Sequence, residues 1–310
     1  MKRCPITYEV ISDDAWYSKR GLHLLSPSLD NLLPLPLTAQ EQRHEAISRA
    51  GKMSIQGVQT KLSAVLKVKE QCFNIVDNNG SYILKTQSLL YPELPENEAA
   101  TMSLAAAIGL DVPVHGLIYS KDNSKTYFIK RFDRVPRNKR VAVEDFAQLL
   151  GLDRDTKYRS SMEQVASVLL KFCTYPRIEC VTLFKLTLFN FLVGNEDMHL
   201  KNFSLIRKNN IISLSPMYDL LNSTIAIKKP TEEIALPLKG RKNNMTMAIF
   251  MSYFGKERLG LNEKTLNTVV HKIQSKLPQW HEIIKHSFLS DEMKGLYLQL
   301  LKEREARLGL

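Results

Sequence analysis

Two acidic side chains and one amide in the second half of the sequence have the types and spacing that phosphoryl transfer requires. Asp197 and Asn202 lie five residues apart in a polar segment, and this segment follows a long apolar stretch. Asp219 comes after an intervening pair of predicted strands. In such a group one side chain can orient an attacking hydroxyl, while the other two hold Mg²⁺ against the phosphates of a nucleotide.

The spacing of Asp197 and Asn202 is that of a kinase catalytic loop, although the tripeptide HRD is absent. His199 and Lys201 lie between them and could neutralise phosphate charge or orient the loop. For His199 a purely structural role is equally open. The sequence contains no HExxH motif or comparable pair of histidines, which argues against a metal-dependent hydrolase.

A second group of residues upstream could bind the phosphates. Lys85 ends a predicted strand and Glu98 lies on the next predicted helix, an arrangement that kinases use to hold the α- and β-phosphates. Residues 51–61 contain two glycines and Ser54, and glycine allows backbone amides to approach phosphate oxygens closely. This segment matches neither GxGxxG nor the P-loop, so taken alone it reads as an ordinary loop. Taken alone, Lys85 and Glu98 also fit surface positions.

The elements that must position these residues fall into two groups. The first half of the sequence predicts a small, mostly antiparallel sheet with strands near 61–69, 73–76, 81–85, 113–119 and 126–131. Residues 77–80 (DNNG) predict a hairpin between the second and third of these strands. Thr38 and Glu41 form a capping box for a helix near 39–50, and a second helix covers 95–109 and ends at Gly109.

The pattern changes to helices after residues 132–136. Segments 143–151, 162–175, 177–193 and most of 262–306 have helical patterns, and 177–193 is apolar nearly all round, as expected of a buried helix. Residues 208–210 (KNN) predict a second hairpin. The sequence therefore predicts an α+β, two-lobed, protein-kinase-like fold. We expect an N-terminal lobe over 1–132 with the Gly-rich loop and the lysine, and a helical C-terminal lobe over 133–310.

Composition limits the classes of protein that fit. The chain has 310 residues, 44% of them apolar, and no uninterrupted apolar run has the length of a membrane span. The N-terminus has no apolar stretch typical of a Sec signal, and the four cysteines form no CxxC pair or zinc spacing. These features favour a cytoplasmic protein with reduced thiols. The residues leave open whether it acts in its own cell or is exported into another.

The formal net charge of +11 lies mostly in residues 151–310. Such an excess attracts polyanions, including nucleic acids and nucleotides. The basic residues occur in short clusters, for example 137–140 and 239–242, with no long basic tail. A solvated basic surface fits this distribution better than a dedicated nucleic-acid groove, so we expect any contact with DNA to be indirect or weak.

Taken together, these motifs resemble the HipA family of bacterial serine/threonine kinases, the toxins of type II toxin–antitoxin modules. The matching pieces lie between about residue 51 and residue 300. They are 54–61 (SIQGVQTK), 83–85 (ILK), 97–98 (NE), 130–134 (KRFDR), 144–146 (EDF), 194–204 (GNEDMHLKNFS) and 217–219 (MYD).

The resemblance implies a set of site residues and the cofactors ATP and Mg²⁺. By it, Asp197 is the catalytic aspartate of a non-specific serine/threonine protein kinase, and Asn202 and Asp219 are the metal ligands. It also implies an autophosphorylated serine, here Ser54, whose phosphate would pull the loop from the ATP site and switch activity off. The implied ATP-binding residues are Ser54, Gln56, Gly57, Lys85, Glu98, Lys130, Phe132, Asp133, His199 and Lys201, with the backbone of 130–132 near adenine and Asp133 near ribose.

The chain departs from full-length HipA proteins before residue 51, where those proteins carry an additional N-terminal subdomain. It is similar in this to the short HipT kinases, in which that subdomain is a separate protein, HipS, encoded beside the DNA-binding HipB. Partners of both kinds are therefore expected. Some HipT relatives carry two serines in the loop, and Gln56 takes the second place here, which leaves Ser54 as the expected site of phosphorylation.

The resemblance further implies that the substrate is an aminoacyl-tRNA synthetase, glutamyl- for HipA and tryptophanyl- for HipT, whose phosphorylation inhibits translation. The short form favours tryptophanyl-tRNA synthetase. Two alternatives stay open: a small-molecule or lipid kinase that uses the same fold, and a non-catalytic basic regulator in a repressor–DNA complex. The presence of Lys85, Asp197, Asn202 and Asp219 together argues against a catalytically dead protein.

Overall fold

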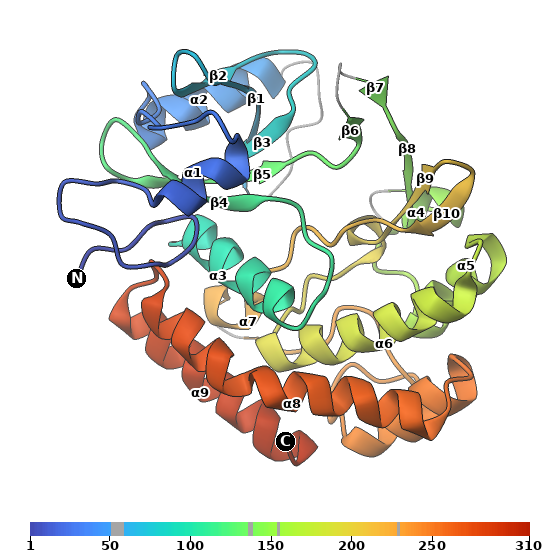
Figure 1. Cartoon of the computed structure of the whole chain (residues 1–310). Helices are drawn as coiled ribbons and strands as arrows, with labels where there is room; N and C mark the ends of the chain where they lie inside the picture. Colours follow the sequence, from blue (N-terminus) through green and yellow to red (C-terminus); the bar gives the residue numbers. More distant parts are fainter. Residues whose placement is uncertain (51–58, 136–138, 154–155, 228–229) are drawn as a thin grey trace. The chain divides into compact units, whose positions relative to one another are not determined.

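The structure, a computed structural model, describes residues 1–50, 59–135, 139–153, 156–227 and 230–310 (Figure 1). The chain divides into two units. The first contains Met1–Ala100, Pro113–Asn138 and Lys285–Ser290, and the second contains Thr101–Val112, Lys139–Ile284 and Asp291–Leu310. The units are thus interleaved in sequence, whereas the expectation from the sequence was a single boundary between residues 132 and 133. Ser54, Gln56 and Gly57 lie outside the described residues.

The first unit is built on a five-stranded antiparallel sheet with the order β2-β1-β3-β5-β4. Its core includes Phe73, Tyr82 and Phe128, whose rings are 5.0–6.2 Å apart between centroids. The strands are β1 (Lys61–Lys67), β2 (Cys72–Ile75), β3 (Tyr82–Lys85), β4 (His115–Tyr119) and β5 (Lys125–Lys130), followed by the short strand β6 (Arg134–Val135).

The predicted hairpin at residues 77–80 is wrong. Strands β2 and β3 both pair with β1, which lies between them, and Ala64 of β1 is opposite Ile75 on one side and Tyr82 on the other. Gly80 is required for a different reason, since a Cβ at this position would lie 2.0 Å from Ser63 Oγ and 2.8 Å from the Ala64 nitrogen. The glycine therefore marks a close approach to β1 and not a two-strand turn.

Helices α1 (Lys19–Leu25) and α2 (Ala39–Ala50) belong to the first unit, as does the first half of α3 (Leu94–Ala107). The capping box of α2 is confirmed, because the Thr38 N–H donates to the Glu41 carboxylate at 2.7 Å and the Glu41 N–H donates to Thr38 Oγ1 at 3.1 Å. Helix α3 is shared: residues 94–100 belong to the first unit and 101–107 to the second. The chain after α3 turns at Gly109, which has a φ of +72°.

The second unit contains most of the helices, with a small sheet of order β10-β9-β8. Helix α6 packs against α5 and α9, and its Phe189 meets Trp280 of α8 edge-on at 5.5 Å (Figure 1). The elements are β7 (Lys139–Arg140), β8 (Ala142–Asp145), α4 (Phe146–Leu149), α5 (Met162–Phe172), α6 (Pro176–Val193), the 3-10 helix η2 (Leu200–Asn202), β9 (Ser204–Lys208), β10 (Ile211–Leu214), α7 (Ser223–Ala226), the π-helix η3 (Ile249–Arg258), α8 (Glu263–His286) and α9 (Asp291–Leu308).

Two predictions about this unit have different outcomes. The hairpin at 208–210 is confirmed: β9 and β10 pair, and Asn209 and Asn210 both have positive φ, as a type I′ turn requires. The helix predicted over 143–151 is wrong in its first part. Residues 142–145 form strand β8, which pairs with β9, and Asp145 then caps the short helix α4. The tertiary pairing overrides the local helical pattern.

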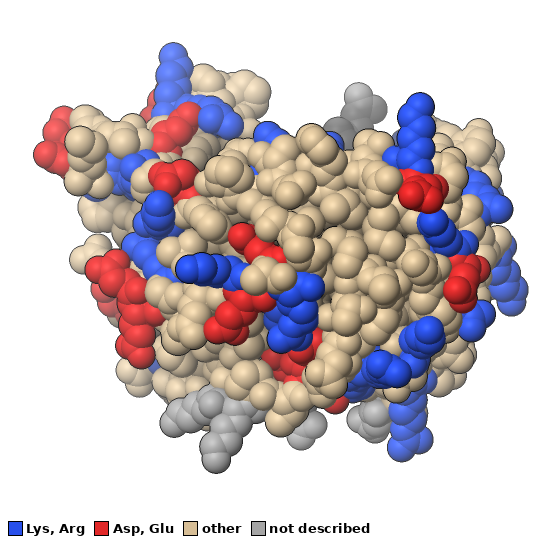
Figure 2. Space-filling model, turned by 90° about the horizontal axis from the view of Figure 1, so that it is seen from below, with Lys and Arg blue, Asp and Glu red and all other residues tan. Residues whose placement is uncertain are grey.

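The charged side chains and the helices of the described residues bear on two features noted in the composition. Figure 2 shows lysine and arginine side chains in separate small groups, with acidic side chains between them on the face drawn. None of the helices in the described ranges combines the length and the hydropathy that crossing a bilayer needs.

Candidate active site

The catalytic-loop segment starts where α6 ends at Gly194. This residue has a φ of +69°, and its N–H donates to the Asn190 and Phe191 carbonyls as a C-terminal cap. A Cβ here would lie 2.5 Å from a methyl carbon of Leu300 and 2.8 Å from Thr224 Oγ1. Glycine is therefore required for both conformation and space, and it directs the chain out of the buried helix into the polar loop.

The Asn195 side chain fixes the start of the loop by hydrogen bonds. It is fully buried, donates to Asn190 Oδ1 at 3.1 Å and accepts from the Asp197 N–H at 3.1 Å. The next residue, Glu196, donates its N–H to Ser223 Oγ at 2.6 Å. These bonds tie the backbone that leads into Asp197 to α6 and α7, so the carboxylate is presented on a fixed turn.

Asp197 and Asn202 are brought together as the sequence predicts. The Asn202 side-chain nitrogen donates to the Asp197 carbonyl at 2.9 Å, and the His199 N–H donates to the same carbonyl at 2.8 Å. Since its amide nitrogen is engaged in this way, Asn202 presents Oδ1 as the acceptor that a metal ion would use. Asn202 is buried and Asp197 is half-buried.

Asp219 lies on a second loop that is tied to the first. The Tyr218 hydroxyl donates to the Lys201 carbonyl at 2.9 Å and lies 2.6 Å from Ser204 Oγ. Asp219 itself has a φ of +55°, a conformation that is uncommon for residues other than glycine and concentrates at functional sites. The predicted metal ligands thus stand on two hydrogen-bonded loops of one unit.

The donor set fits Mg²⁺. Asn202 and Asp219 offer an amide oxygen and a carboxylate, and Mg²⁺ typically takes one or two protein oxygens, with water and substrate phosphates completing its shell. Within the described ranges, no group of three or more histidine, cysteine, aspartate or glutamate side chains is placed to hold a metal ion.

His199 is buried against the loop. Burial lowers the pKa of its imidazole, as does the Lys157 charge, and the carboxylates of Asp197 and Asp219 oppose this. Its ring stands edge-on to Tyr158, with 5.1 Å between centroids, and the Tyr158 hydroxyl donates a hydrogen bond to Asp197 Oδ1. Neither Tyr158 nor Asn195 was predicted from the sequence. The partner of Tyr158 lies 39 residues away, whereas the Asn195 side chain accepts from the N–H two residues on, a local contact that asparagine commonly makes.

Lys85 and Glu98 form a buried ion pair in the first unit. The Lys85 ammonium is 2.6 and 2.8 Å from the two Glu98 oxygens, and the side chains are 5% and 3% exposed. The ammonium also lies 5.5 Å from the centre of the Tyr127 ring. This is the predicted arrangement of a strand lysine and a helix glutamate.

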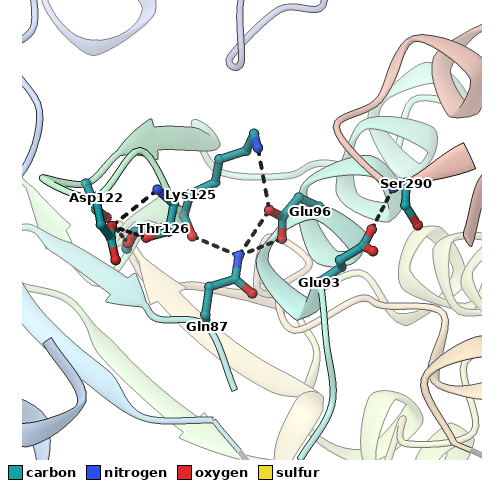
Figure 3. A network of polar contacts seen from close by, with 9 residues as sticks. Gln87, Glu93, Glu96, Asp122, Lys125, Thr126 and Ser290 are labelled. Carbon is teal, nitrogen blue, oxygen red and sulfur yellow. Dashed lines mark hydrogen bonds and ion pairs between the residues drawn. The ribbon is translucent and has the colours of Figure 1, made fainter. Parts of the chain in front are cut away.

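A second polar network fixes the start of α3 (Figure 3). The Gln87 amide donates to both Glu96 oxygens, at 3.0 and 2.9 Å, and to the Lys125 carbonyl at 3.1 Å. Burial raises the pKa of the Glu96 carboxyl, and the Lys125 ammonium is 4.0 Å away. Glu93 accepts from the Ser290 N–H at 2.7 Å, which ties residues 285–290 to the first unit.

The residues predicted near adenine and ribose lie at the end of β5 and just after it. Lys130 is exposed, and its N–H donates to the Val114 carbonyl, while Phe132 and Asp133 are half-buried. Asp133 accepts two hydrogen bonds from Arg131 and also pairs with Arg134. Burial alone would raise its pKa, but these arginines lower it, so the carboxylate is ionised and already engaged by two cations.

The model of the HipA-like C-terminal domain family matches residues 53–281. The chain belongs to this family. A curated protein of Haemophilus influenzae with the name "Putative kinase" is 30% identical over 95% of this chain and 93% of its own length. The serine/threonine-protein kinase toxin HipA of Shewanella oneidensis is 26% identical over 74% of this chain, but this corresponds to only 56% of the toxin's length.

Among solved structures, the complex of HipA, HipB and operator DNA from Shewanella oneidensis is similar to the chain. The match has a TM-score of 0.70 at 23% identity and covers 91% of this chain and 74% of that one. The α+β, HipA-like fold predicted from the sequence is thereby confirmed. Membership in the HipA-like C-terminal domain family is confirmed as well, and the toxin role and the HipT subtype stay predictions.

Proposed function

We propose that the protein is an ATP- and Mg²⁺-dependent serine/threonine-protein kinase toxin of the short HipT type. The observation that carries the proposal is the buried Lys85–Glu98 pair. Burying two charges costs several kcal/mol per ion, so such a pair is weak evidence for a purely stabilising role. In a member of this family, an ammonium steadied by a carboxylate is suited to holding nucleotide phosphates.

The proposed roles follow the chemistry of each side chain. Asp197 orients the acceptor hydroxyl and accepts its proton, while Lys85, steadied by Glu98, holds the phosphates, and His199 and Lys201 contribute beside them. Asn202 and Asp219 would hold Mg²⁺, which neutralises phosphate charge when bound. Residues 130–132 and Asp133 contact the nucleoside. Ser54, in the loop with Gln56 and Gly57, is the proposed site of autophosphorylation that switches the kinase off.

The proposed substrate is an aminoacyl-tRNA synthetase, tryptophanyl-tRNA synthetase before glutamyl-tRNA synthetase. The proposed partners are a HipB-like DNA-binding protein and a HipS-like small protein. The HipB proposal is supported by the similar HipA of Shewanella oneidensis, whose structure contains HipB and its operator DNA. Any contact of this chain itself with DNA is proposed to be indirect or weak.

The test compares the wild-type protein with Asp197→Asn in the presence of labelled ATP and Mg²⁺. Each is incubated with purified tryptophanyl- and glutamyl-tRNA synthetase, with dephosphorylated casein as a general acceptor and with a panel of small alcohols. We expect wild type to label a protein and Asp197→Asn to label none. Labelling of small alcohols alone would support a small-molecule kinase instead. Mass spectrometry of active protein should find phosphate on Ser54, and phosphate only elsewhere would contradict the proposed switch.

A further inference from the structure

The Asp197 carboxylate already has a hydroxyl group bound to it, from within its own unit. Tyr158, on the segment between α4 and α5, donates its phenolic O–H to Asp197 Oδ1. Its ring stands nearly perpendicular to that of His199, at an interplanar angle of 85°. Both partners of Tyr158 therefore belong to the loop that carries the proposed chemistry.

The backbone around Tyr158 is anchored to the same loop. The Leu200 N–H donates to the Lys157 carbonyl at 3.3 Å, and the Arg159 N–H donates to the Thr156 carbonyl at 2.7 Å. The Lys157 ammonium lies 5.0 Å from the centre of the Tyr158 ring. Tyr158 thus reaches Asp197 from a segment that is itself hydrogen-bonded to the catalytic-loop segment.

The chemistry of this contact mimics that of an acceptor. Burial and the Asp197 carboxylate raise the pKa of the Tyr158 phenol, so at neutral pH it is a protonated donor. A serine or threonine hydroxyl must donate to the same carboxylate from about 2.6–3.2 Å before its proton can be transferred. Tyr158 is 40% exposed, so it occupies the carboxylate from a side that solvent reaches.

We propose that Tyr158 is an internal competitor for the acceptor hydroxyl. Without an acceptor, its phenol occupies Asp197 and keeps water from this carboxylate, and an acceptor hydroxyl displaces it by exchanging one O–H···O bond for another. The acceptor oxygen then attacks the γ-phosphorus, its proton passes to Asp197, and ADP leaves. The inference rests on the proposed function, since it requires Asp197 to accept that proton. It selects for acceptors that gain enough binding energy elsewhere to displace the phenol.

The test uses Tyr158→Phe, which removes the hydroxyl and keeps the ring beside His199. With dephosphorylated casein and labelled ATP, the KM for casein should fall about tenfold with kcat retained, because a hydrogen bond to a charged group no longer competes. Acceptor-free hydrolysis of ATP should rise. Tyr253→Phe is the matched control, since the Tyr253 hydroxyl donates to the Glu163 carboxylate at 2.9 Å outside this loop. This control should change neither the KM for casein nor the rate of acceptor-free hydrolysis.

A lower kcat with an unchanged KM would make Tyr158 a positioning residue for Asp197 and would overturn the proposal, as would unchanged constants. A second readout needs no turnover: the dissociation constant of fluorescein-labelled casein in the presence of Mg²⁺ and a non-hydrolysable ATP analogue. It should fall about tenfold in Tyr158→Phe, and equal values in both proteins would also overturn the proposal. If wild type transfers no phosphate, the proposed function fails, whereas this binding comparison still decides the role of Tyr158.

Discussion

The Lys85 ammonium and the Asp197 carboxylate are held by different kinds of structure. Lys85 and Glu98 come from a strand and a helix, are buried, and neutralise each other. Asp197 stands half-buried on a loop, held through its backbone by Asn195 and contacted at its carboxylate by Tyr158. The first site depends on charge pairing between regular elements, and the second on hydrogen bonds made by loop residues, one of which is donated to the Asp197 carboxylate. Substitutions at the two sites should therefore separate stability from catalysis.

The largest effect on stability is expected from Lys85→Met. It leaves the Glu98 carboxylate buried without the Lys85 charge, and breaking a buried pair in this way costs about 3–5 kcal/mol. Urea unfolding should show this loss, and phosphoryl transfer should fall as well. The double variant Lys85→Met/Glu98→Gln should recover much of the stability but none of the activity.

Lys125→Met is the matched control for that prediction. Its ammonium is 24% exposed and 4.0 Å from Glu96, so its removal should cost at most about 1 kcal/mol. Equal losses for the variants of Lys85 and Lys125 would contradict the distinction between a buried pair and a partly exposed one.

Gly194→Ala should have the next largest effect, and in the second unit. The substitution combines a left-handed backbone with a Cβ that clashes with Leu300 and Thr224, for an expected loss of about 2–3 kcal/mol. Because Asp197 lies on the loop that Gly194 starts, kcat should fall together with stability. Gly151→Ala has a similar φ of +67° and no atom within 4 Å of the new Cβ, so it should lose only about 1 kcal/mol and leave kcat unchanged.

Asn195→Ala should reduce catalysis more than stability. It leaves the Asp197 N–H and the Asn190 side chain without their shared partner, at a cost of about 1–2 kcal/mol. We expect kcat to fall about tenfold because the carboxylate is less well positioned. The control Asn243→Ala removes an exposed side chain that donates to the Thr231 carbonyl. Its kcat for phosphoryl transfer should be indistinguishable from that of wild type. A fully active Asn195→Ala protein would refute the positioning role.

The smallest effect concerns the dependence of stability on pH in the first unit. Burial raises the pKa of the Glu96 carboxyl, so the folded state binds its proton more readily than the unfolded chain does. Its ionisation therefore lowers the free energy of unfolding as pH rises from the unfolded value of about 4.3 through the raised folded value. Glu96→Gln removes this dependence, and urea unfolding between pH 4 and 7 should show the variant gaining on wild type as pH rises. Parallel curves of unfolding free energy against pH for the two proteins would contradict this prediction.

The parts of the site that the sequence predicted are those with a local signal. Helix α6 is apolar on all sides, Gly194 ends it, and the Asp197–Asn202 spacing lies within one short segment. Lys85 and Glu98 were paired by analogy with kinases, and their contact joins two neighbouring elements. In each case the chain itself brings the residues close together.

Apart from Asn195, whose bond to the Asp197 N–H is local, the missed features depend on contacts between parts of the chain that lie far apart in the sequence or are not adjacent along it. Tyr158 lies 39 residues before Asp197, and nothing near it in the sequence indicates a carboxylate partner. Strand β1 lies between β2 and β3 because it is long enough to pair with both, which the turn residues 77–80 do not encode. Strand β8 forms only because β9 is available to pair with it.

The hydroxyl of Tyr218 has a consequence for the exchange of loops between relatives. It joins the loop of Asn202 to the loop of Asp219 through Lys201 and Ser204, so residues 195–204 and 217–219 are structurally coupled. A chimaera that takes only one of the two loops from a relative would combine loops whose contacts need not match. Recombination within this family should therefore succeed when both loops and Tyr218 are transferred together.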